Sequence, residues 1–305
     1  MVASLRASLR ALLRALLRAS LRASLRASLR ASLRALLPPP PPASFPCVMA
    51  PAELETSEAE SAARGDAVKR AYVRRIFGEI APRYDLLNHL LSFNIDRRWR
   101  DRAIGELGVE LAPTGAWLDL CAGTLDVGAQ LVARPDFRGH VIGADFAEPM
   151  LRAGRAKGAG RIAPVVADAI ELPLPDQSVD GAIVAFGIRN VANLDAALAE
   201  VLRVLKPRGR FVILEFSTPR SRLVRAGYHA YFHHVLPAIG GLVSGHRTAY
   251  AYLPRSVQHF PVEEQLAARC TAAGFARVRW QSLTFGVAAI HVGERPAAPN
   301  VQGRP

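Results

Sequence analysis

The chain has 305 residues, and 39 lysines and arginines against 26 aspartates and glutamates give it a formal net charge of +13. Eight of those arginines lie in residues 1–49, which contain no acidic residue, so the remaining 256 residues carry 31 − 26 = +5. Because the basic excess is mostly confined to one end, it does not indicate a nucleic-acid-binding surface. Half of the chain is hydrophobic, so residues 50–305 can bury one full-size core, which excludes disorder and a fibrous fold there.

The cysteines favour a reducing, cytoplasmic compartment. There are three, Cys47, Cys121 and Cys270, and none belongs to a C-x-x-C pattern, so neither a disulfide framework nor a structural zinc site is expected. No cluster of His, Asp or Glu has the spacing of metal ligands, and we expect no metal ion. No apolar run approaches the roughly 18 to 20 residues of a membrane span, so contact with a bilayer would be peripheral.

Residues 1–49 form a low-complexity segment. A-S-L-R and A-L-L-R units repeat from Ala3 to Leu37 and end in the proline run 38–42. Because a four-residue repeat drifts around a helix of 3.6 residues per turn, the leucines build no fixed apolar face. Three interpretations stay open: a segment that binds anionic lipid, an organelle transit peptide, or sequence upstream of a later start at Met49. The composition favours the third.

The remaining chain, residues 50–295, is predicted to be one α/β domain. Residues 66–107 are expected to be helical, because apolar residues recur there at three-to-four spacing. Short β-rich runs then alternate with helical segments, which is typical of a doubly wound parallel sheet. The predicted strands cover residues 116–120, 140–145, 162–166, 179–186 and 210–216, and the predicted helices cover 125–134, 147–157 and 193–205.

The C-terminal part departs from this alternation. Two β-rich runs, 277–280 and 286–292, are too close in sequence for a helical crossover, so we expect an antiparallel pair at the sheet edge. Residues 217–258 are rich in aromatic residues and histidine, and we interpret them as a helical insert over the functional site. The last residues, 296–305, contain three prolines and are expected to be a frayed tail.

The turn after the first predicted strand indicates a small-molecule site. Small residues follow Asp119 there, so the backbone can approach a ligand at Gly123. Asp145 ends the second strand, 22 residues past Gly123, where its carboxylate can accept two ribose hydroxyls. Pyrophosphate binding would need G-x-G-x-x-G, whereas Asp126 presents a negative charge that suits the cationic end of S-adenosylmethionine. Alternatively, Asp119 and Asp126 only cap the helix.

Further motifs, taken in order, resemble a known class of enzymes. Asp168 and Ala169 follow the third strand, and L-K-P-R-G at 205–209 precedes the fifth. With D-L-C-A-G-T and the strand-terminal Asp, this order resembles the S-adenosylmethionine-dependent class I methyltransferases. Over residues 70–294 the chain is similar to the ubiquinone/menaquinone biosynthesis C-methyltransferase family. The blocks that carry this narrower resemblance are Y-D-L-L-N-H-L-L-S-F-N-I-D-R-R-W-R from Tyr84, F-G-I-R-N-V from Phe186, L-E-F-S-T-P from Leu214, and two blocks within 234–257.

This resemblance implies a fold, a methyl donor and a reaction. The fold is a Rossmann-like, mostly parallel seven-stranded sheet with an antiparallel C-terminal edge, a helical N-terminal cap and a helical insert. The donor is S-adenosylmethionine, and the reaction is methylation of a ring carbon late in the synthesis of a respiratory quinone. Together with the turn described above, the resemblance gives six candidate cofactor-binding residues. They are Asp119, Gly123, Thr124, Asp145, Asp168 and Ala169.

The sequence departs from the family pattern at three positions. Leu125 stands where the family usually has the second glycine of G-T-G, so the backbone would approach the methionine moiety differently. Ala185 replaces a serine that is common before F-G-x-R-N, which removes one side-chain contact. His246 follows S-G where an acid is frequent. These departures bear on affinity more than on the type of reaction.

Carbon methylation needs an electron-rich carbon, which a quinol supplies when its hydroxyl ionises. We predict that Arg189, just past the fourth strand, stabilises the resulting oxyanion or orients a water that takes the proton. A guanidinium with a pKa above about 12 is itself a poor base. The alternative for Arg189 is an ion pair on the surface or at an interface. Candidate bases are Asp96 and three histidines of the insert, His229, His233 and His234.

The expected substrate is a polyprenyl quinol whose tail stays in lipid, so the protein would act from the cytoplasm at the membrane surface. The block at residues 244–256, S-G-H-R-T-A-Y-A-Y-L-P-R-S, favours demethylmenaquinol over the benzoquinol of ubiquinone synthesis. Apolar residues of the insert, Tyr228 and Tyr231 among them, are expected to form an entrance that faces the lipid. Two alternatives from other classes are a nicotinamide oxidoreductase and a basic surface-binding protein. No nucleic-acid partner is expected, and a homo-oligomer is left open.

Overall fold

The structure, a computed structural model, describes residues 68–81, 84–85, 92, 94–158, 160–231 and 247–297. The predictions for the low-complexity segment 1–49 and for nearly all of the tail lie outside these residues. So do those for His233, His234 and His246, and for the central part of the predicted insert, residues 232–246.

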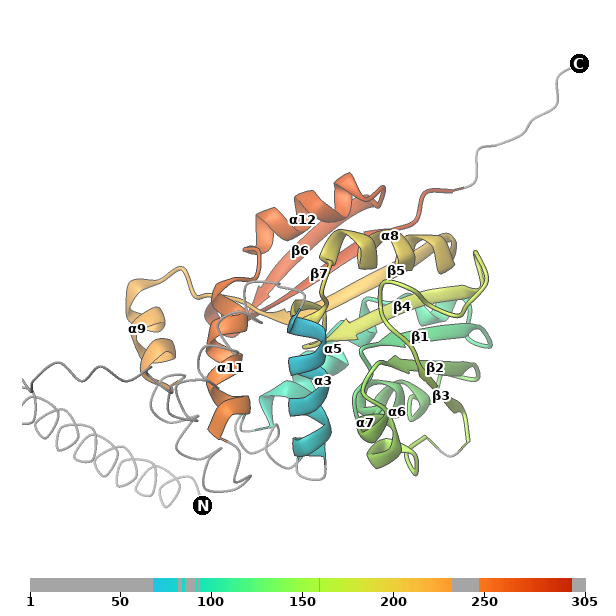
Figure 1. Cartoon of the computed structure of the whole chain (residues 1–305). Coiled ribbons are helices and arrows are strands. Elements are labelled where there is room, and N and C mark those ends of the chain that lie inside the picture. The colour runs from blue at the N-terminus through green and yellow to red at the C-terminus, as the bar shows by residue number, and fades with distance from the viewer. Residues whose placement is uncertain are drawn as a thin grey trace, which may run out of the picture. The chain divides into compact units, whose positions relative to one another are not determined.

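A seven-stranded sheet forms the centre of the described chain (Figure 1). Its strand order is β3-β2-β1-β4-β5-β7-β6, in which the first five pair in parallel and β7 runs antiparallel to both β5 and β6. The predicted mostly parallel sheet with an antiparallel C-terminal edge is therefore confirmed. The strands are β1 (Ala116–Leu120), β2 (His140–Asp145), β3 (Ile162–Val166), β4 (Val179–Ala185), β5 (Leu205–Phe216), β6 (Ala276–Leu283) and β7 (Ala288–Glu294).

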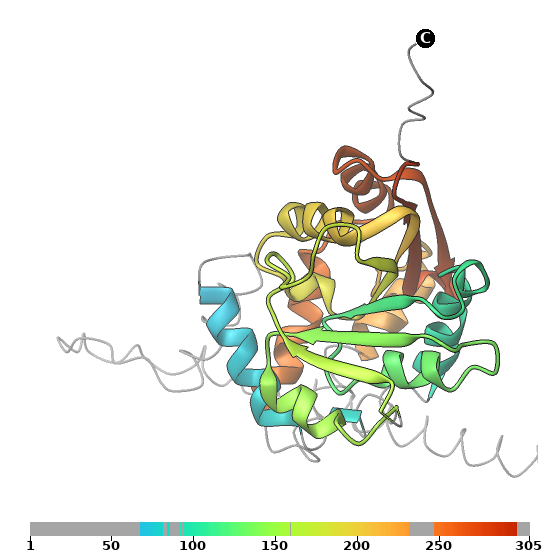
Figure 2. The same ribbon diagram turned by 90° about the vertical axis from the view of Figure 1, so that its right-hand side faces the viewer.

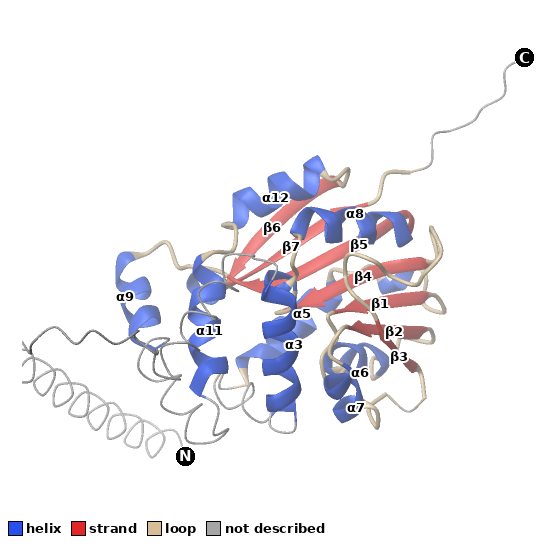
Figure 3. Ribbon diagram, viewed as in Figure 1, coloured by secondary structure: helices blue, strands red, loops and turns tan. Residues whose placement is uncertain are grey.

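Helices cover both faces of this sheet. Figures 1 and 2 agree that α8 and α12 lie on one side, while α6 and α7 lie on the other (Figure 2). Figure 3 shows the same layers coloured by secondary structure. The described helices are α3 (Val68–Ile80), α5 (Ile95–Gly105), α6 (Asp126–Val132), α7 (Glu148–Gly154), α8 (Leu194–Val204), α9 (Arg222–Ala230), α11 (Arg247–Gln258) and α12 (Glu263–Ala272), with the short 3-10 turns η2 (Val109–Leu111), η3 (Ile188–Asn190) and η5 (Thr284–Gly286).

Two apolar clusters, one on each face, form the core. Successive side chains of a strand point to opposite faces, so Trp117 joins one cluster and Leu118 the other. Trp117 packs with Leu131 of α6, whereas Leu118 packs with the apolar faces of α8 and α12. Parallel strands that are buried on both faces consist of nearly continuous apolar runs. This is why β1 and β4 could be located from sequence to within one residue.

Two elements differ from the sequence-based expectation. Strand β5 begins at Leu205, because the predicted turn 205–209 is a bulge within the strand. Val179 of β4 pairs with Leu205 and Gly181 with Arg210, so β5 advances five residues while β4 advances two. Helix α12, which leads from the insert into β6, was not predicted at all. Of the insert itself, the described residues contain α9 and α11.

The described residues contain no helix that is both long enough and apolar enough to cross a bilayer. The N-terminal cap is represented by α3, a short helical turn at 84–85, and α5. Helix α3 packs against α7, α11 and η3. The cap therefore lies beside the carboxyl ends of the parallel strands, where β1, β2 and β4 end.

Candidate active site

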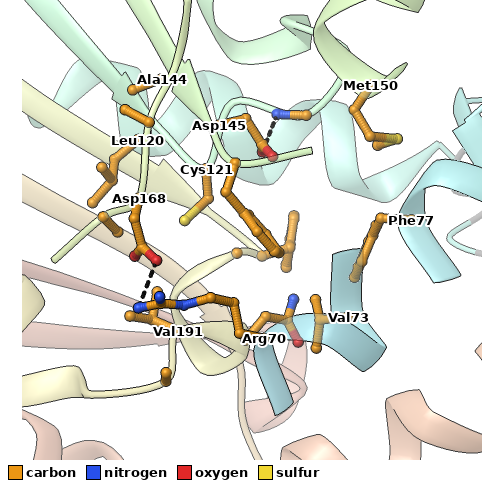
Figure 4. A pocket seen from close by; sticks show the side chains of 18 of the residues that line it. Arg70, Val73, Phe77, Leu120, Cys121, Ala144, Asp145, Met150, Asp168 and Val191 are labelled. Atoms are coloured by element: carbon orange, nitrogen blue, oxygen red, sulfur yellow. Dashed lines mark hydrogen bonds and ion pairs between the residues drawn. The ribbon is translucent and has the colours of Figure 1, made fainter. Parts of the chain in front are cut away.

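A pocket opens at the carboxyl ends of the parallel strands, next to α3 (Figure 4). Its lining comes from the ends of β1, β2 and β4, from the turn after β3, from η3, and from the cap. Open α/β sheets bind ligands at this edge. Four of the predicted cofactor-binding residues line the pocket: Gly123, Asp145, Asp168 and Ala169.

Asp145 forms the acidic wall of the pocket at the end of β2. Its Oδ2 accepts a 2.9 Å hydrogen bond from the amide of Gly123, and its Oδ1 accepts one of 2.8 Å from the amide of Ala147. Burial raises the pKa of Asp145, and these backbone hydrogen bonds oppose the rise. The two bonds fix the carboxylate against the turn after β1. Each oxygen keeps a further lone pair for a ligand hydroxyl.

Asp168 lies across the pocket and is bound to the cap. Arg70 of α3 reaches its Oδ2 with an Nη2–Oδ2 distance of 2.9 Å (Figure 4). Oδ1 accepts a 3.2 Å hydrogen bond from the amide of Ile170. Arg70 was not singled out from the sequence, because nothing local to α3 indicates that it meets the turn after β3.

The turn between β1 and α6 is strained at the position where the sequence departs from the family pattern. Leu125 has φ 64° and ψ 24°, in the left-handed region that glycine normally occupies. Its side chain is only 1% exposed and packs over Gly143, where any Cβ would lie 2.4 Å from Leu125 Cδ2. The buried leucine therefore holds the turn in the conformation that a glycine would adopt without strain.

Two predicted cofactor residues, Asp119 in β1 and Thr124 in this turn, do not line the pocket. Asp119 is buried beneath the turn, and its Oδ2 accepts a 2.9 Å hydrogen bond from the amide of Gly128 in α6. The geometry is that of the capping alternative. Thr124 is 3% exposed, and its hydroxyl donates a hydrogen bond to Asp85 of the cap. Both residues therefore stabilise the turn through hydrogen bonds on the side that faces away from the pocket.

Asp126 forms ion pairs with two basic side chains of the protein. Its negative charge had been predicted to suit a cationic ligand. Its Oδ2 lies 3.0 Å from Arg100 Nη1, and its Oδ1 lies 2.5 Å from Lys157 Nζ. Lys157 also contacts Asp85 at 2.6 Å. Asp126 thus belongs to an ion-pair network that joins the cap to α6 and to the turn after α7. The acids that face the pocket are Asp145 and Asp168.

The candidate catalytic residue Arg189 lies in η3, directly after β4. Its side chain is 7% exposed, and Nη1 pairs with Glu215 at the end of β5 and donates a 2.7 Å hydrogen bond to the carbonyl of Phe186. Nε donates to Ser256 Oγ of α11 at 3.3 Å. The guanidinium also lies 5.4 Å from the ring centroid of Phe216. Burial raises the pKa of Glu215, although Arg189 opposes the rise.

Beside this pair, Asn190 turns toward the pocket. It lines the cavity, it is 9% exposed, and its buried Oδ1 accepts no hydrogen bond from any residue that the structure describes. A buried carbonyl oxygen without a donor is costly, so a ligand N–H or O–H would stabilise it. Asn190 and Glu215 both stand within the sequence blocks of the family resemblance, but their roles become visible only in the structure.

Asp96, the other candidate catalytic residue, lies away from the pocket. It is buried in the first turn of α5, 3.2 Å from Arg100 Nη1, and accepts a 2.5 Å hydrogen bond from Ser92. Its position is that of a structural ion pair. Among the described residues, no group of three or more His, Cys, Asp or Glu side chains could hold a metal ion.

Fold and site together define the class. A doubly wound sheet of this strand order, with an acidic residue ending β2 at the ligand edge, has class I methyltransferase architecture. Two solved structures share the fold. One is the [4+2]-cyclase SpnF, with a TM-score of 0.55 and 17% identity, covering 74% of this chain and 97% of that chain. The other is the complex between the Haloferax volcanii Trm112 methyltransferase activator and the putative methyltransferase, with a TM-score of 0.53 and 18% identity, covering 72% of this chain and 97% of that chain. Because one of them is a cyclase, the fold alone does not specify the reaction.

Sequence comparison specifies the family. The ubiE/COQ5 methyltransferase family matches residues 66–295. The demethylmenaquinone methyltransferase of Thermus thermophilus is 51% identical over 224 residues, which are 72% of this chain and 100% of that protein. The ubiquinone/menaquinone biosynthesis C-methyltransferase UbiE of Geobacter sulfurreducens is 46% identical over 73% of this chain and 88% of its own length. The chain belongs to the ubiE/COQ5 methyltransferase family.

Proposed function

We propose that the protein transfers the methyl group of S-adenosylmethionine to a ring carbon of a polyprenyl quinol, with demethylmenaquinol as the preferred acceptor. Membership of the ubiE/COQ5 methyltransferase family over residues 66–295 is the observation that carries this proposal. The relatives from Thermus thermophilus and Deinococcus radiodurans are named demethylmenaquinone methyltransferases, which favours a naphthoquinol head group. The name of the Geobacter relative covers both quinones, so the benzoquinol of ubiquinone synthesis is the second acceptor.

The pocket residues fit an adenosyl donor. Asp145 offers carboxylate oxygens at the strand end, where they can accept the two ribose hydroxyls. Asp168 and the neighbouring Ala169 stand on the other side of the pocket, where they can bind the adenine edge. The unbonded Oδ1 of Asn190 supplies an acceptor suited to an ammonium group. Gly123 allows close approach of the backbone at the turn, at φ 53°.

When bound, S-adenosylmethionine supplies an electrophilic methyl group on a positively charged sulfur. The protein must hold the quinol carbon beside that methyl group and favour ionisation of the quinol hydroxyl. Once methylated, the ring carbon loses its own hydrogen as a proton, which restores the aromatic quinol. We assign the second task to the Arg189–Glu215 pair. Neither residue lines the pocket, so Arg189 donates to the developing oxyanion of a quinol that reaches past Phe186 and Asn190, which do line it. Glu215 holds the guanidinium in place and, with its pKa raised by burial, is a better proton acceptor than an exposed carboxylate.

The insert reaches the proposed catalytic pair. Tyr228 of α9 lies close enough to Arg189 and Glu215 for their charges to act on its hydroxyl, and burial raises the pKa of that hydroxyl. The side chain therefore extends from the insert toward the proposed catalytic pair. A polyprenyl tail stays in the bilayer, so in this proposal the protein acts from the cytoplasm as a peripheral enzyme at the membrane surface.

The test is a methyl-transfer assay with the full chain and radiolabelled S-adenosylmethionine. Reduced naphthoquinol and benzoquinol acceptors are compared, and we expect faster transfer to the naphthoquinol. Asp145→Ala should abolish donor binding measured by calorimetry. Asp136→Ala, which removes an exposed acid paired with Arg134, is the matched control and should bind normally. Absence of transfer to either quinol by folded protein would refute the proposal, and tight NAD binding instead would favour an oxidoreductase.

A further inference from the structure

We propose that α9 and the η5 turn form a lipid-docking lip, in which Leu223 and Phe285 insert into an anionic membrane surface at the edge of the sheet where the pocket opens. The proposal rests on the proposed function, because docking on a membrane brings the pocket to an acceptor that is carried in lipid. Leu223 and Phe285 are each 84% exposed, the highest values among the large hydrophobic residues of the described chain. Water-facing side chains of this size are typical of an interaction surface when they gather in one place.

The two residues stand on neighbouring segments. The amide of Ser217, just after β5, donates a 3.0 Å hydrogen bond to the carbonyl of Val287, which follows η5. Gly286 packs against the same segment, since a Cβ built on it would lie 3.3 Å from Pro219 Cα. This segment leads directly into α9. The left-handed backbone of Phe285, with φ 58° and ψ 25°, is part of the turn that presents its ring to solvent.

The lip carries positive charge that the described residues do not neutralise. Helix α9 contains no acidic residue, and none of its residues is fully buried, although the hydroxyl of Tyr228 is enclosed. Arg225 donates to the carbonyls of Pro219 and Arg220, which holds its side chain beside the turn, and neither Arg222 nor Arg225 forms an ion pair within the described part of the chain. Arg220, in contrast, pairs with Glu264 and lies over Trp280. Exposed apolar residues flanked by unpaired arginines complement anionic lipid headgroups.

The position of the lip favours a membrane over a second copy of the chain. The lip follows the ends of β5 and β6, on the edge where the pocket opens, and Figure 1 shows α9 beyond the strand ends. A symmetric dimer would place the patch against itself and oppose its own arginines. Two isolated apolar side chains are also far from the roughly 1,200 Å² that stable protein interfaces bury. A lipid surface satisfies both the apolar tips and the arginines.

Penetration is tested with tryptophan probes in the full chain and vesicles of phosphatidylcholine and phosphatidylglycerol that carry brominated acyl chains. The variants are Leu223→Trp, Phe285→Trp and, as matched control, Leu111→Trp. Leu111 is 72% exposed but precedes β1, at the opposite edge of the sheet. After subtraction of the wild-type signal, we expect quenching at 223 and 285 and none at 111. Equal quenching at all three positions, or none at 223 and 285, would overturn the proposal.

The arginines are tested in the Phe285→Trp background. Arg222→Gln with Arg225→Gln should raise the lipid concentration needed for half-maximal quenching by about tenfold or more, because each basic residue near an anionic surface contributes about 1 kcal/mol. An unchanged midpoint would contradict the role of these arginines. If sedimentation instead reveals a wild-type dimer that Leu223→Ser with Phe285→Ser dissociates, the surface is an interface between copies and the lipid proposal is wrong.

A final comparison separates this proposal from the proposed function. Leu223→Ser with Phe285→Ser should methylate a water-soluble, short-tailed quinol at the wild-type rate, but should lose activity on a long-tailed quinol carried in vesicles. If this variant methylates both acceptors at the wild-type rate, the lip proposal is wrong. If the wild-type protein methylates neither acceptor, the proposed function fails, while the quenching experiment still decides whether the lip enters lipid.

Discussion

The Lys69 ammonium group of α3 donates a 2.9 Å hydrogen bond to the main-chain carbonyl of Arg189 in η3, 120 residues away in sequence. A second bond, of 3.0 Å, reaches the carbonyl of Val191. The next residue, Arg70, binds Asp168. Two consecutive basic residues of the cap thus bind two segments that line the pocket. Lys69 binds the turn after β4, and Arg70 binds the turn after β3.

We predict that the stability difference between wild type and Lys69→Met depends on pH. Burial, and then the charge of Arg189, lower the pKa of Lys69 from 10.5 to about 8. Between these values the unfolded chain binds the proton and the folded chain does not, so the contribution of Lys69 to stability rises as pH rises from about 8 to 10.5. Urea unfolding at pH 7.5 and pH 10 should show wild type gaining on Lys69→Met at the higher pH. If the stability difference between the two proteins stays constant or reverses, the pKa of Lys69 is not lowered in the folded protein.

The Arg189–Glu215 pair gives a second prediction. Glu215→Leu leaves the Arg189 guanidinium buried without its counter-charge, which is expected to cost about 3 to 5 kcal/mol, whereas removing both charges is often neutral. The double variant Arg189→Met with Glu215→Leu should therefore unfold at higher denaturant than Glu215→Leu alone, although both should be inactive.

The conservative variant Glu215→Gln separates positioning from folding. We expect it to bind S-adenosylmethionine normally, because neither residue lines the pocket, and to lose about tenfold or more in kcat. Glu294→Gln, which breaks the surface pair with Arg277, is the matched control and should keep wild-type turnover. Wild-type kcat in Glu215→Gln would remove Glu215 from the mechanism.

The sequence predicted the parts of the fold that local patterns determine. Strands β1, β2 and β3 match their predicted residues because each is a short apolar run between turn residues. Asp145 was predicted from its place at the end of the second strand, whereas Asp168 joined the same predicted site through the resemblance to the methyltransferases, and both line the pocket. Arg70 and Glu215 were not assigned roles, because their contacts join segments far apart in the chain. Helix α12, which begins after the predicted end of the insert at residue 258, was missed because its only buried apolar residues are Leu266 and Cys270, too few for a periodic pattern.

Leu125 gives a third prediction, on the conformation of the turn. In an ordinary position alanine is more stable than glycine by about 0.5 to 1 kcal/mol. At Leu125, with φ 64°, the order should reverse, because only glycine adopts this backbone without strain. Both Leu125→Ala and Leu125→Gly should be less stable than wild type, since each removes a side chain buried with Ala122 and Leu151.

Chemical denaturation of the two variants provides the measurement. Ala129, which lies within α6, offers the control: Ala129→Gly should be destabilised in the usual direction. If Leu125→Ala proves more stable than Leu125→Gly, the left-handed conformation is absent in solution. The backbone of the turn at Gly123 would then face the pocket in a different conformation.

Asp119 gives the last prediction, which concerns pH. Burial raises the pKa of Asp119 from 3.8 to about 7, against the opposing effects of the Gly128 hydrogen bond and Arg100, while Asp145 and Asp126 raise it further. Because the folded pKa lies above the unfolded one, the stability that protonated Asp119 contributes is present below about pH 4 and is lost as pH rises to about 7.

Asp119→Asn does not titrate, and its amide oxygen can still accept the Gly128 hydrogen bond. The variant should therefore gain on wild type between pH 5 and pH 8, by at most about 3 kcal/mol. Asp136→Asn is the control, because Arg134 lowers the pKa of this exposed acid, and its difference from wild type should stay constant over that interval. A flat profile for Asp119→Asn would mean that this carboxylate is ionised throughout, and that the charge beneath the turn is held by Arg100 rather than by a proton.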